Sequence, residues 1–529
     1  MYDFILRNTT LVDGTRVLPR KADVCIKDGK IAALPTHCEE RGQKELDVAG
    51  MIVAPGFIDI HTHSDTAPFN RISAPQSKLF QGVTLEITGN CGISALPLSG
   101  RFRAELIAFY HAALPSTVEL VPLTDDTTQD YRRHVAEVGA AINYGVLIGH
   151  GTLRGSVMGF GMRRPTAVEQ AQMEAVLDRE LSYGAFGMSL GLIYPPSSYG
   201  DAEELIGLSR VLARHKAILS VHLRNEAPGV FDAIKEIITV AKASGVHAQI
   251  SHLKLMGKAQ WGRAGELLAL IHAAQAEGVN ITCDQYPYTA SSTGLSALAP
   301  GWAHDGGAQE LLARLKNPEQ RLLADIAAEM DRRGGPKSVM ISSTHGYMPE
   351  AEGKTIAELS NERGISPEQM VAQCLHQCDT SVSCIYSSMD SGDVFAIMKD
   401  MDVAVGSDGS SFAYDDIARA SHLHPRNFGT FPRFFQTVFE QKLMSVEDAV
   451  YKVSGLPAHI LGLSDRGIIA PGKTADLTVF DCHTIKDCCT YTDTVVKPQG
   501  IYHVFVNGVP ALLDGVQTQE RSGCVLCHQ

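Results

Sequence analysis

The sequence places histidine, cysteine and aspartate side chains near the ends of several short apolar runs. His61 and His63 form a His-x-His pair in "DIHTHSD", and Cys91 follows the run "GVTLEITG" on a glycine-flanked loop. Three further candidates lie in the later runs "AILSVHLR", "HAQISHLK" and "DVAVGSDG": His222, His252 and Asp408. Residues at i and i+2 of a strand point to the same side, so His61 and His63 can chelate one divalent ion.

Each of these residues, taken alone, has a common structural explanation. A lone histidine is typical of a hydrogen-bonded core residue, a lone cysteine of a small buried hydrophobe, and an aspartate in "GSDGSS" of a turn. Because all six fall at matching ends of predicted strands, we interpret them together as a metal site. A soft thiolate combined with imidazoles favours zinc.

Eight apolar runs alternate with helical stretches such as "AVEQAQMEAVLDRELSYG", which is the pattern of repeated strand-helix units. They predict an α/β fold, a closed (β/α)8 barrel of the TIM type, with its active site at the carboxyl ends of the strands. The eight runs are "GFIDIHTH", "GVTLEITG", "YGVLIGHG", "GAFGMSLGL", "AILSVHLR", "HAQISHLK", "NITCDQYPY" and "DVAVGSDG".

Both ends of the chain show hairpin patterns, with turn pairs such as Asp28-Gly29 between short β-type runs. We therefore expect residues 1–54 and 467–529 to form one small β-sandwich domain, and residues 55–466 to form the barrel. The interval between the seventh and eighth runs is too long for an ordinary loop and contains helical patterns. We assign about 300–380 to an inserted lid between strands 7 and 8.

The bulk properties limit the classes of partner. The 529 residues carry a formal charge of −13 without long runs of one sign, which argues against nucleic acid and anionic membranes as partners. The absence of a signal-like start and of a long apolar segment predicts a cytoplasmic protein whose twelve cysteines are thiols. The terminal "CVLCHQ" has the C-x-x-C-H spacing of haem attachment, but no haem-protein context, so we expect a mobile tail.

Two groups of motifs carry a resemblance to known proteins. "PGFIDIHTHSD" and "GIIAPGKTADLTVFD" resemble the opening and closing signatures of the metal-dependent amidohydrolase superfamily. "GVTLEITGNCGIS", "SVHLRNE", "ISHLK", "DQYPYTASSTGL", "GSDGS" and "HPRNFGTFPRFF" resemble, in order, the D-aminoacylase (N-acyl-D-amino-acid deacylase) family. Many amidohydrolases carry a metal-bridging lysine on the fourth strand, which the run "GAFGMSLGL" lacks. Cys91 is similar to the cysteine that replaces it in D-aminoacylases.

The resemblance implies an activity and an arrangement of ligands. It implies zinc-dependent hydrolysis of N-acyl-D-amino acids to a carboxylate and a free D-amino acid. Cys91, His222 and His252 would form a tight zinc site. His61, His63 and Asp408 would form a second site that is often weak or empty in the family. Asp408 is the expected catalytic residue, taking a proton from water and returning it to the leaving amine.

An N-acyl amino acid substrate also requires groups that bind its α-carboxylate. Lys254 points to the same side of its strand as a predicted ligand two residues earlier, and Arg426 can form a bidentate contact. Tyr286 and Ser292 can donate hydroxyl hydrogen bonds. The resemblance supports these four residues and adds Tyr194 as a substrate contact.

Two alternatives remain open from the sequence. One is a cyclic-amide hydrolase of the dihydropyrimidinase or hydantoinase kind, which the missing lysine disfavours. The other is a non-catalytic scaffold on the same barrel, which the intact ligand set disfavours. The preferred side chain, the acyl group and the oligomeric state are not assigned by any residue pattern.

Overall fold

The computed structural model describes residues 1–69, 75–98, 100–113, 125–415 and 422–528. Eight parallel strands form one sheet in which neighbours follow the chain order, as the eight apolar runs predict. Its strands are β6 (Phe57–Asp59), β7 (Val83–Thr88), β8 (Asn143–Gly149), β9 (Gly187–Gly191), β10 (Ile218–His222), β11 (His247–Ile250), β12 (Ile281–Gln285) and β16 (Val403–Val405). The predicted (β/α)8 barrel is confirmed.

The barrel closes between its first and last strands just beyond their carboxyl ends. The backbone N–H of Asp408 donates to the His61 carbonyl at 2.9 Å, and that of His63 to the Gly409 carbonyl at 2.9 Å. Thr62 and Gly409 form a parallel bridge at the same level. The seam therefore brings two predicted ligand segments, 61–63 and 408, side by side.

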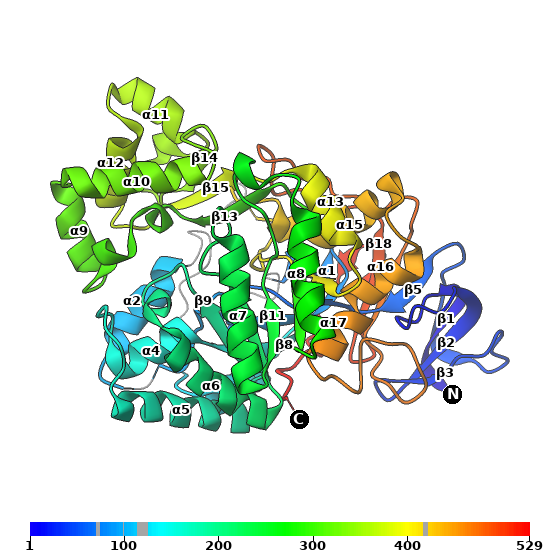
Figure 1. Ribbon diagram of the computed structural model, residues 1–529. Coiled ribbons are helices and arrows are strands. Elements are labelled where there is room, and N and C mark those ends of the chain that lie inside the picture. Colours follow the sequence, from blue (N-terminus) through cyan, green and yellow to red (C-terminus); the bar gives the residue numbers. More distant parts are fainter. Residues whose placement is uncertain (70–74, 99, 114–124, 416–421, 529) are drawn as a thin grey trace.

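Helices cover the outside of the barrel (Figure 1). In α6, for example, the Asp201 side chain caps the first turn by accepting from Glu204 N–H, and Leu205, Leu208 and Leu212 face the core. The helices outside the insertion are α1 (Gln76–Leu79), α2 (Arg103–Ala113), α3 (Thr128–Val138), α4 (His150–Met158), α5 (Ala167–Ser182), α6 (Ala202–His215), α7 (Val230–Ser244), α8 (Ala264–Ala276), α13 (Ser391–Lys399), α15 (Arg426–Gln441), α16 (Val446–Val453) and α17 (Gly455–Ile460).

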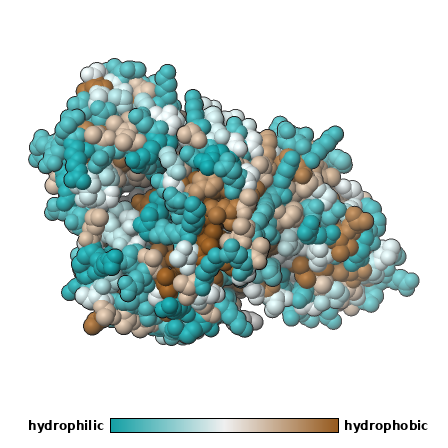
Figure 2. Space-filling model, viewed as in Figure 1, coloured by the Kyte–Doolittle hydropathy of each residue, from teal (hydrophilic) through white to brown (hydrophobic). Residues whose placement is uncertain are grey.

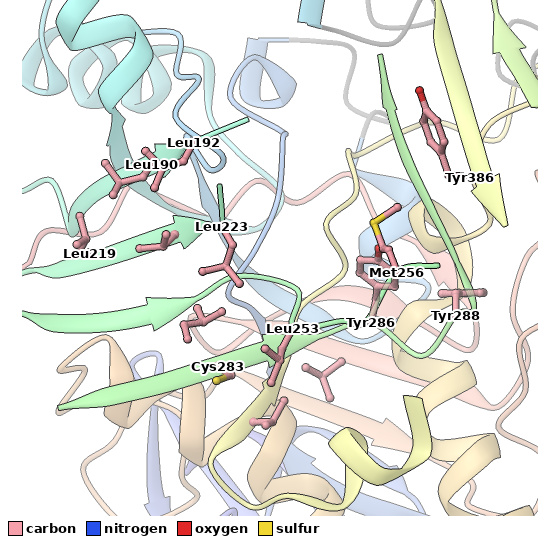
Figure 3. Packing of buried hydrophobic residues seen from close by; sticks show 14 of the residues in the cluster. Leu190, Leu192, Leu219, Leu223, Leu253, Met256, Cys283, Tyr286, Tyr288 and Tyr386 are labelled. Atoms are coloured by element: carbon pink, nitrogen blue, oxygen red, sulfur yellow. The ribbon is translucent and has the colours of Figure 1, made fainter. Parts of the chain in front are cut away.

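The interior and surface follow the expected apolar pattern. Aliphatic side chains from β9 to β12 and their following loops, including Leu190, Leu219 and Leu253, pack together, and Tyr286 and Tyr288 lie beyond the end of β12 (Figure 3). The face shown in Figure 2 is mainly hydrophilic, with hydrophobic residues gathered near α7 and α8. Within the described ranges, no helix combines the length and apolarity needed to cross a membrane.

The two ends of the chain share one nine-stranded sheet. Asp28 and Gly29 both have positive φ, 50° and 74°, so the predicted turn pair joins β2 to β3 in a tight hairpin. Strand β17 pairs with β5, which connects the C-terminal hairpins to the N-terminal ones. The strands are β1 (Tyr2–Leu11), β2 (Arg20–Lys27), β3 (Lys30–Ala33), β4 (Gly42–Asp47), β5 (Ile52–Pro55), β17 (Leu477–Phe480), β18 (Ile501–Val506), β19 (Val509–Leu513) and β20 (Val516–Gln517).

The insertion between β12 and β16 is a separate lobe beside the barrel (Figure 1). It contains a three-stranded sheet in which β15 pairs with both β13 and β14. The lobe is wider than the predicted 300–380, because its first and last strands pair with each other, with Ser292 opposite Ile385. Its elements are β13 (Ala290–Gly294), α9 (Ala308–Lys316), α10 (Gln320–Arg332), β14 (Val339–Ser343), α11 (Ile356–Arg363), α12 (Pro367–Gln377) and β15 (Ser383–Ser387).

The C-terminal tail is bound to the barrel, so the expectation of a mobile tail is wrong. Tyr144 N–H donates to the Cys524 carbonyl at 2.9 Å, and Leu526 N–H to the Tyr144 carbonyl at 2.7 Å. His528 N–H donates to the Gly184 carbonyl at 3.0 Å, and Val525 is buried. Backbone pairing with the start of β8 and burial of an apolar side chain together order a segment whose composition alone resembles a loop.

Candidate metal centre

The six predicted ligands converge at the carboxyl ends of the barrel strands. Their side chains form two groups. Within each group, the potential ligand atoms all lie within 4.8 Å of one another. The groups are Cys91, His222 and His252, and His61, His63, Cys91 and Asp408. Cys91 belongs to both groups, as expected of a thiolate that bridges two neighbouring ion positions.

The distances within the first group are close to those of a tetrahedral zinc site. Cys91 Sγ lies 3.5 Å from His252 Nε2, which lies 3.0 Å from His222 Nδ1. Zinc bonds of about 2.0–2.3 Å in tetrahedral geometry place neighbouring ligand atoms about 3.3–3.6 Å apart. The distance between the cysteine and the histidine falls in this range, and the distance between the two histidines is a few tenths of an ångström shorter. The donor types and spacing therefore fit a zinc ion.

The second group is similarly compact but includes a carboxylate. Asp408 Oδ1 lies 3.0 Å from His63 Nε2 and 3.4 Å from His61 Nε2. Cys91 Sγ lies 3.3 Å from His61 Nε2. These residues fit a second divalent ion, with Asp408 as its carboxylate ligand.

Three of the candidate ligands have an unusual backbone conformation. Cys91, His252 and Asp408 have φ values of 54°, 37° and 51°, in the left-handed region that non-glycine residues rarely adopt. Gly92, after the cysteine, packs so closely that an added Cβ would lie 2.5 Å from Gly191 N. Such strain costs of order 1–3 kcal/mol per residue and is concentrated at functional sites. The glycine-flanked loop thus directs the thiol into the centre.

The electrostatic environment favours a thiolate at Cys91. Burial opposes ionisation, but the imidazoles of His61, His222 and His252 hold the pKa of Cys91 well below its usual range. The thiolate is the form of cysteine that binds metal ions. Burial also opposes ionisation of Asp408, yet the Arg426 guanidinium and the neighbouring imidazoles hold the pKa of Asp408 well below its usual range.

Two carboxylates that the sequence interpretation missed, one buried and one nearly so, orient the imidazoles. Asp284 Oδ1 lies 3.3 Å from His61 Nδ1 and also accepts from His252 N–H at 2.7 Å. Glu226 Oε1 lies 3.0 Å from His252 Nδ1, and its Oε2 lies 3.7 Å from His222 Nε2. Such carboxylates fix the tautomer and orientation of metal-binding histidines. The sequence offered one indication of these two residues, because each is an acidic residue inside a ligand-bearing or neighbouring motif, "HLRNE" or "CDQYPY".

A fully buried ion pair secures the loop that carries Asp408. Lys78 Nζ lies 2.8 Å from Asp59 Oδ2 and donates to Ser407 Oγ at 2.8 Å. Ser407 N–H donates to the other Asp59 oxygen at 2.8 Å. Because Asp59 is on β6 and Ser407 follows β16, this network joins the two strands at the seam.

The five predicted substrate-contacting residues lie around the same centre. Lys254 Nζ lies 2.6 Å from Glu226 Oε1 and 5.7 Å from the centroid of the Tyr286 ring. The Arg426 guanidinium carbon lies 5.3 Å from that centroid, and its Nη2 donates to the Ser292 carbonyl at 3.2 Å. The Tyr194 ring lies 5.1 Å from the ring of His222. The Lys254 ammonium and the Arg426 guanidinium therefore both lie within 6 Å of the centre of the Tyr286 ring.

The hydroxyl of Tyr286 is a free donor at this position. It is buried, and within the described residues no group accepts or donates a hydrogen bond to it. A buried hydroxyl without a partner costs about 1–3 kcal/mol, so this group is available to donate a hydrogen bond to a ligand.

A closed parallel barrel with clustered thiolate, imidazole and carboxylate groups at its carboxyl end defines a metal-dependent hydrolase class. The amidohydrolase family model matches residues 44–511. The chain belongs to the amidohydrolase family.

The full chain is similar to deacylases of N-acyl-D-amino acids. It is 34% identical over 533 residues to N-acyl-D-aspartate deacylase of Alcaligenes xylosoxydans xylosoxydans, covering 99% of this chain and 95% of that protein. The structure of N-acyl-D-glutamate deacylase from Bordetella bronchiseptica, complexed with zinc and a phosphonate mimic of the tetrahedral intermediate, superposes with a TM-score of 0.82. It is 31% identical and covers 99% of each chain.

A D-aminoacylase structure gives the same TM-score of 0.82 at 33% identity, over 99% of this chain and 100% of the other. That work describes a binuclear metal centre with one-metal activation and second-metal attenuation. A D-hydantoinase structure is only 17% identical with a TM-score of 0.55, which shows the shared fold alone.

Proposed function

We propose that this protein is a zinc-dependent deacylase that hydrolyses the amide bond of N-acyl-D-amino acids to a carboxylate and a free D-amino acid. The observation that carries this proposal is the Cys91, His222 and His252 group with Asp408 beside it and two cations next to it. The first three residues would hold the zinc ion. A bound zinc ion would supply Lewis-acid polarisation of water and of the scissile carbonyl.

We propose that Asp408 moves the proton of the reaction. Its Oδ1 faces the imidazoles, whereas its Oδ2 is held by Arg426 at 2.6 Å. The first oxygen can accept a proton from the attacking water and return it to the nitrogen of the leaving amine. The seam network through Ser407 keeps that oxygen directed at the centre.

Lys254 and Arg426 are proposed to bind the substrate α-carboxylate, with the Tyr286 hydroxyl as a further donor. Both cations are nearly buried, and charge-assisted hydrogen bonds to a carboxylate are strong where water is excluded. Tyr194 and Ser292 would line the same substrate site. They lie close together, because the Tyr194 hydroxyl forms a hydrogen bond of 2.7 Å with Thr293, the residue after Ser292. A free carboxylate on a linear substrate fits this arrangement.

Further proposals concern the domain boundaries, the role of the insertion and the cellular location of the protein. We infer that residues 1–54 and 467–529 form one domain beside the barrel of 55–466, and that the insertion acts as a lid. The Tyr194 to Thr293 contact supports the lid, since it joins a barrel loop to a strand of the insertion. Unpaired thiols at all twelve cysteines support a cytoplasmic location.

A hydrolysis screen tests the proposed function. Purified protein with defined zinc is incubated with N-acetyl amino acids of both chiralities, and the released amine is quantified. We expect turnover of D-enantiomers that depends on zinc, and no comparable turnover of hydantoin or dihydropyrimidine. Hydrolysis of the cyclic amides alone would support the hydantoinase alternative, and absence of any turnover would support the scaffold.

A further inference from the structure

The two oxygens of Asp408 face different cations. Oδ1 lies 3.0 Å from His63 Nε2, at the second ion position. Oδ2 lies 2.6 Å from Arg426 Nη1. Any ion bound by this carboxylate at the second position therefore has a fixed positive charge on the opposite side of the same carboxylate.

The guanidinium of Arg426 is held in place by its surroundings. Its Nη2 donates to the Ser292 carbonyl at 3.2 Å, and its carbon lies over the Tyr286 ring at 5.3 Å. The residue is 6% exposed and begins helix α15, so its backbone is also restrained. These contacts leave the guanidinium little freedom to withdraw when a second ion arrives.

The charge balance of the centre favours one divalent ion. The ligand set contains two anions, the Cys91 thiolate and the Asp408 carboxylate. Glu226 is already paired with Lys254, and Asp284 lies behind the imidazoles, where three groups contact its carboxylate. With one ion in the first position, Arg426 already balances Asp408, so a second ion adds two positive charges without a matching anion.

We propose that Arg426, which pairs with the far oxygen of Asp408, weakens binding of a second divalent ion by competing for the negative charge of that carboxylate. This inference rests on the proposed zinc site but not on the proposed substrate. It gives a physical reason why this protein would bind only one divalent ion tightly. A ligand carboxylate that pairs with Arg426 would lessen that competition, so the ligand and the second ion would strengthen each other's binding.

The test is a metal titration that does not involve activity. Protein holding one zinc per chain is titrated with further Zn²⁺ by calorimetry, in the wild type and in Arg426→Gln, whose amide can still bond to Ser292 and Asp408. We expect the variant to bind the second ion roughly tenfold tighter or more, the usual scale for groups next to a metal ligand. Arg426→Lys, which keeps the charge, should remain closer to the wild type.

Arg433→Gln is the matched control, because Arg433 lies on the same helix but pairs with Asp487 at 3.6 Å and packs on Tyr288. It should bind the second ion as the wild type does.

Affinity for the first zinc should be unchanged in all variants, and thermal unfolding confirms that each is folded. If Arg426→Gln does not fold, Arg426→Met is titrated in the same way. Equal or weaker second-ion binding in a folded neutral variant overturns the proposal. Loss of the first ion from the wild type would instead refute the zinc site.

Discussion

Replacing Glu226 with glutamine isolates the role of a carboxylate that touches three groups of the centre. Glu226 lies 2.6 Å from Lys254 Nζ and 3.0 Å from His252 Nδ1, and its other oxygen lies 3.7 Å from His222 Nε2. Burial opposes its ionisation, but Lys254 and the imidazoles hold the pKa of Glu226 well below its usual range. Glutamine keeps the volume and removes the charge.

Two effects of Glu226→Gln follow from this geometry. Loss of a carboxylate behind a ligating histidine lowers metal affinity by about 10–100-fold. The variant also leaves the Lys254 ammonium, 5% exposed, without its counter-ion, and breaking a buried pair costs about 3–5 kcal/mol. Since the amide still offers one acceptor, we expect a loss of about 3 kcal/mol in the free energy of unfolding of the zinc-free protein.

Zinc affinity is measured by competition with a chromogenic chelator, and stability by urea unfolding of the zinc-free protein. Glu236→Gln is the matched control, because Glu236 also pairs with a cation, Arg224 at 3.0 Å, but in a more exposed position. It should leave zinc affinity unchanged and cost no more than about 1 kcal/mol. Zinc binding by Glu226→Gln within twofold of the wild type would show that this carboxylate does not support the zinc ligands.

Four further predictions concern single residues. Cys91→Ala should lose most of the tightly bound zinc, as measured by elemental analysis. Asp408→Asn should keep that zinc while kcat for an N-acyl-D-amino acid falls by roughly 10²-fold or more, the scale for losing a general acid-base group. Lys254→Ala should raise KM more than it lowers kcat in steady-state kinetics. Burial lowers the pKa of His247 from 6.5 to about 4. The neutral imidazole therefore contributes up to about 3 kcal/mol of stability above pH 6.5, and this contribution is lost as the pH falls towards 4. In urea unfolding at a series of pH values, His247→Gln should show a smaller loss of stability over this range.

Distinct outcomes contradict each of these predictions. Unchanged zinc content in Cys91→Ala removes the thiol from the centre. Near-normal turnover in Asp408→Asn rules out its role as the proton carrier. A fall in kcat with constant KM in Lys254→Ala places that residue in the chemical step rather than in substrate binding. An equally steep decline of stability between pH 6.5 and 4 in His247→Gln assigns the decline to other groups.

The barrel and its ligands were predictable because strand periodicity and residue chemistry coincide. Each ligand lies at or just beyond the end of an apolar run, and parallel strands bring all such ends to one side, so His61 and Cys91 meet without any knowledge of side-chain packing. Asp284 and Glu226 were not predictable in the same way. Their roles depend on which nitrogen of each imidazole they face, and only the packed structure defines that.

The tail and the limits of the insertion depend on long-range pairing, which the sequence does not encode locally. Val525 is ordered because the distant Tyr144 offers free backbone groups to its neighbours. Ser292 belongs to the insertion because it pairs with Ile385, almost a hundred residues later. In both cases the partner lies far along the chain, where composition and periodicity carry no information about it.

Stoichiometric reconstitution with zinc shows whether one ion per chain is sufficient for catalysis. Metal-free protein is titrated with Zn²⁺, and hydrolysis of an N-acetyl-D-amino acid is measured after each addition, with the L-enantiomer as control. We predict that activity towards the D-enantiomer rises linearly to one zinc per chain and does not increase beyond it. Activity that is independent of zinc, or that requires two ions per chain, would contradict a deacylase mechanism with a single zinc ion.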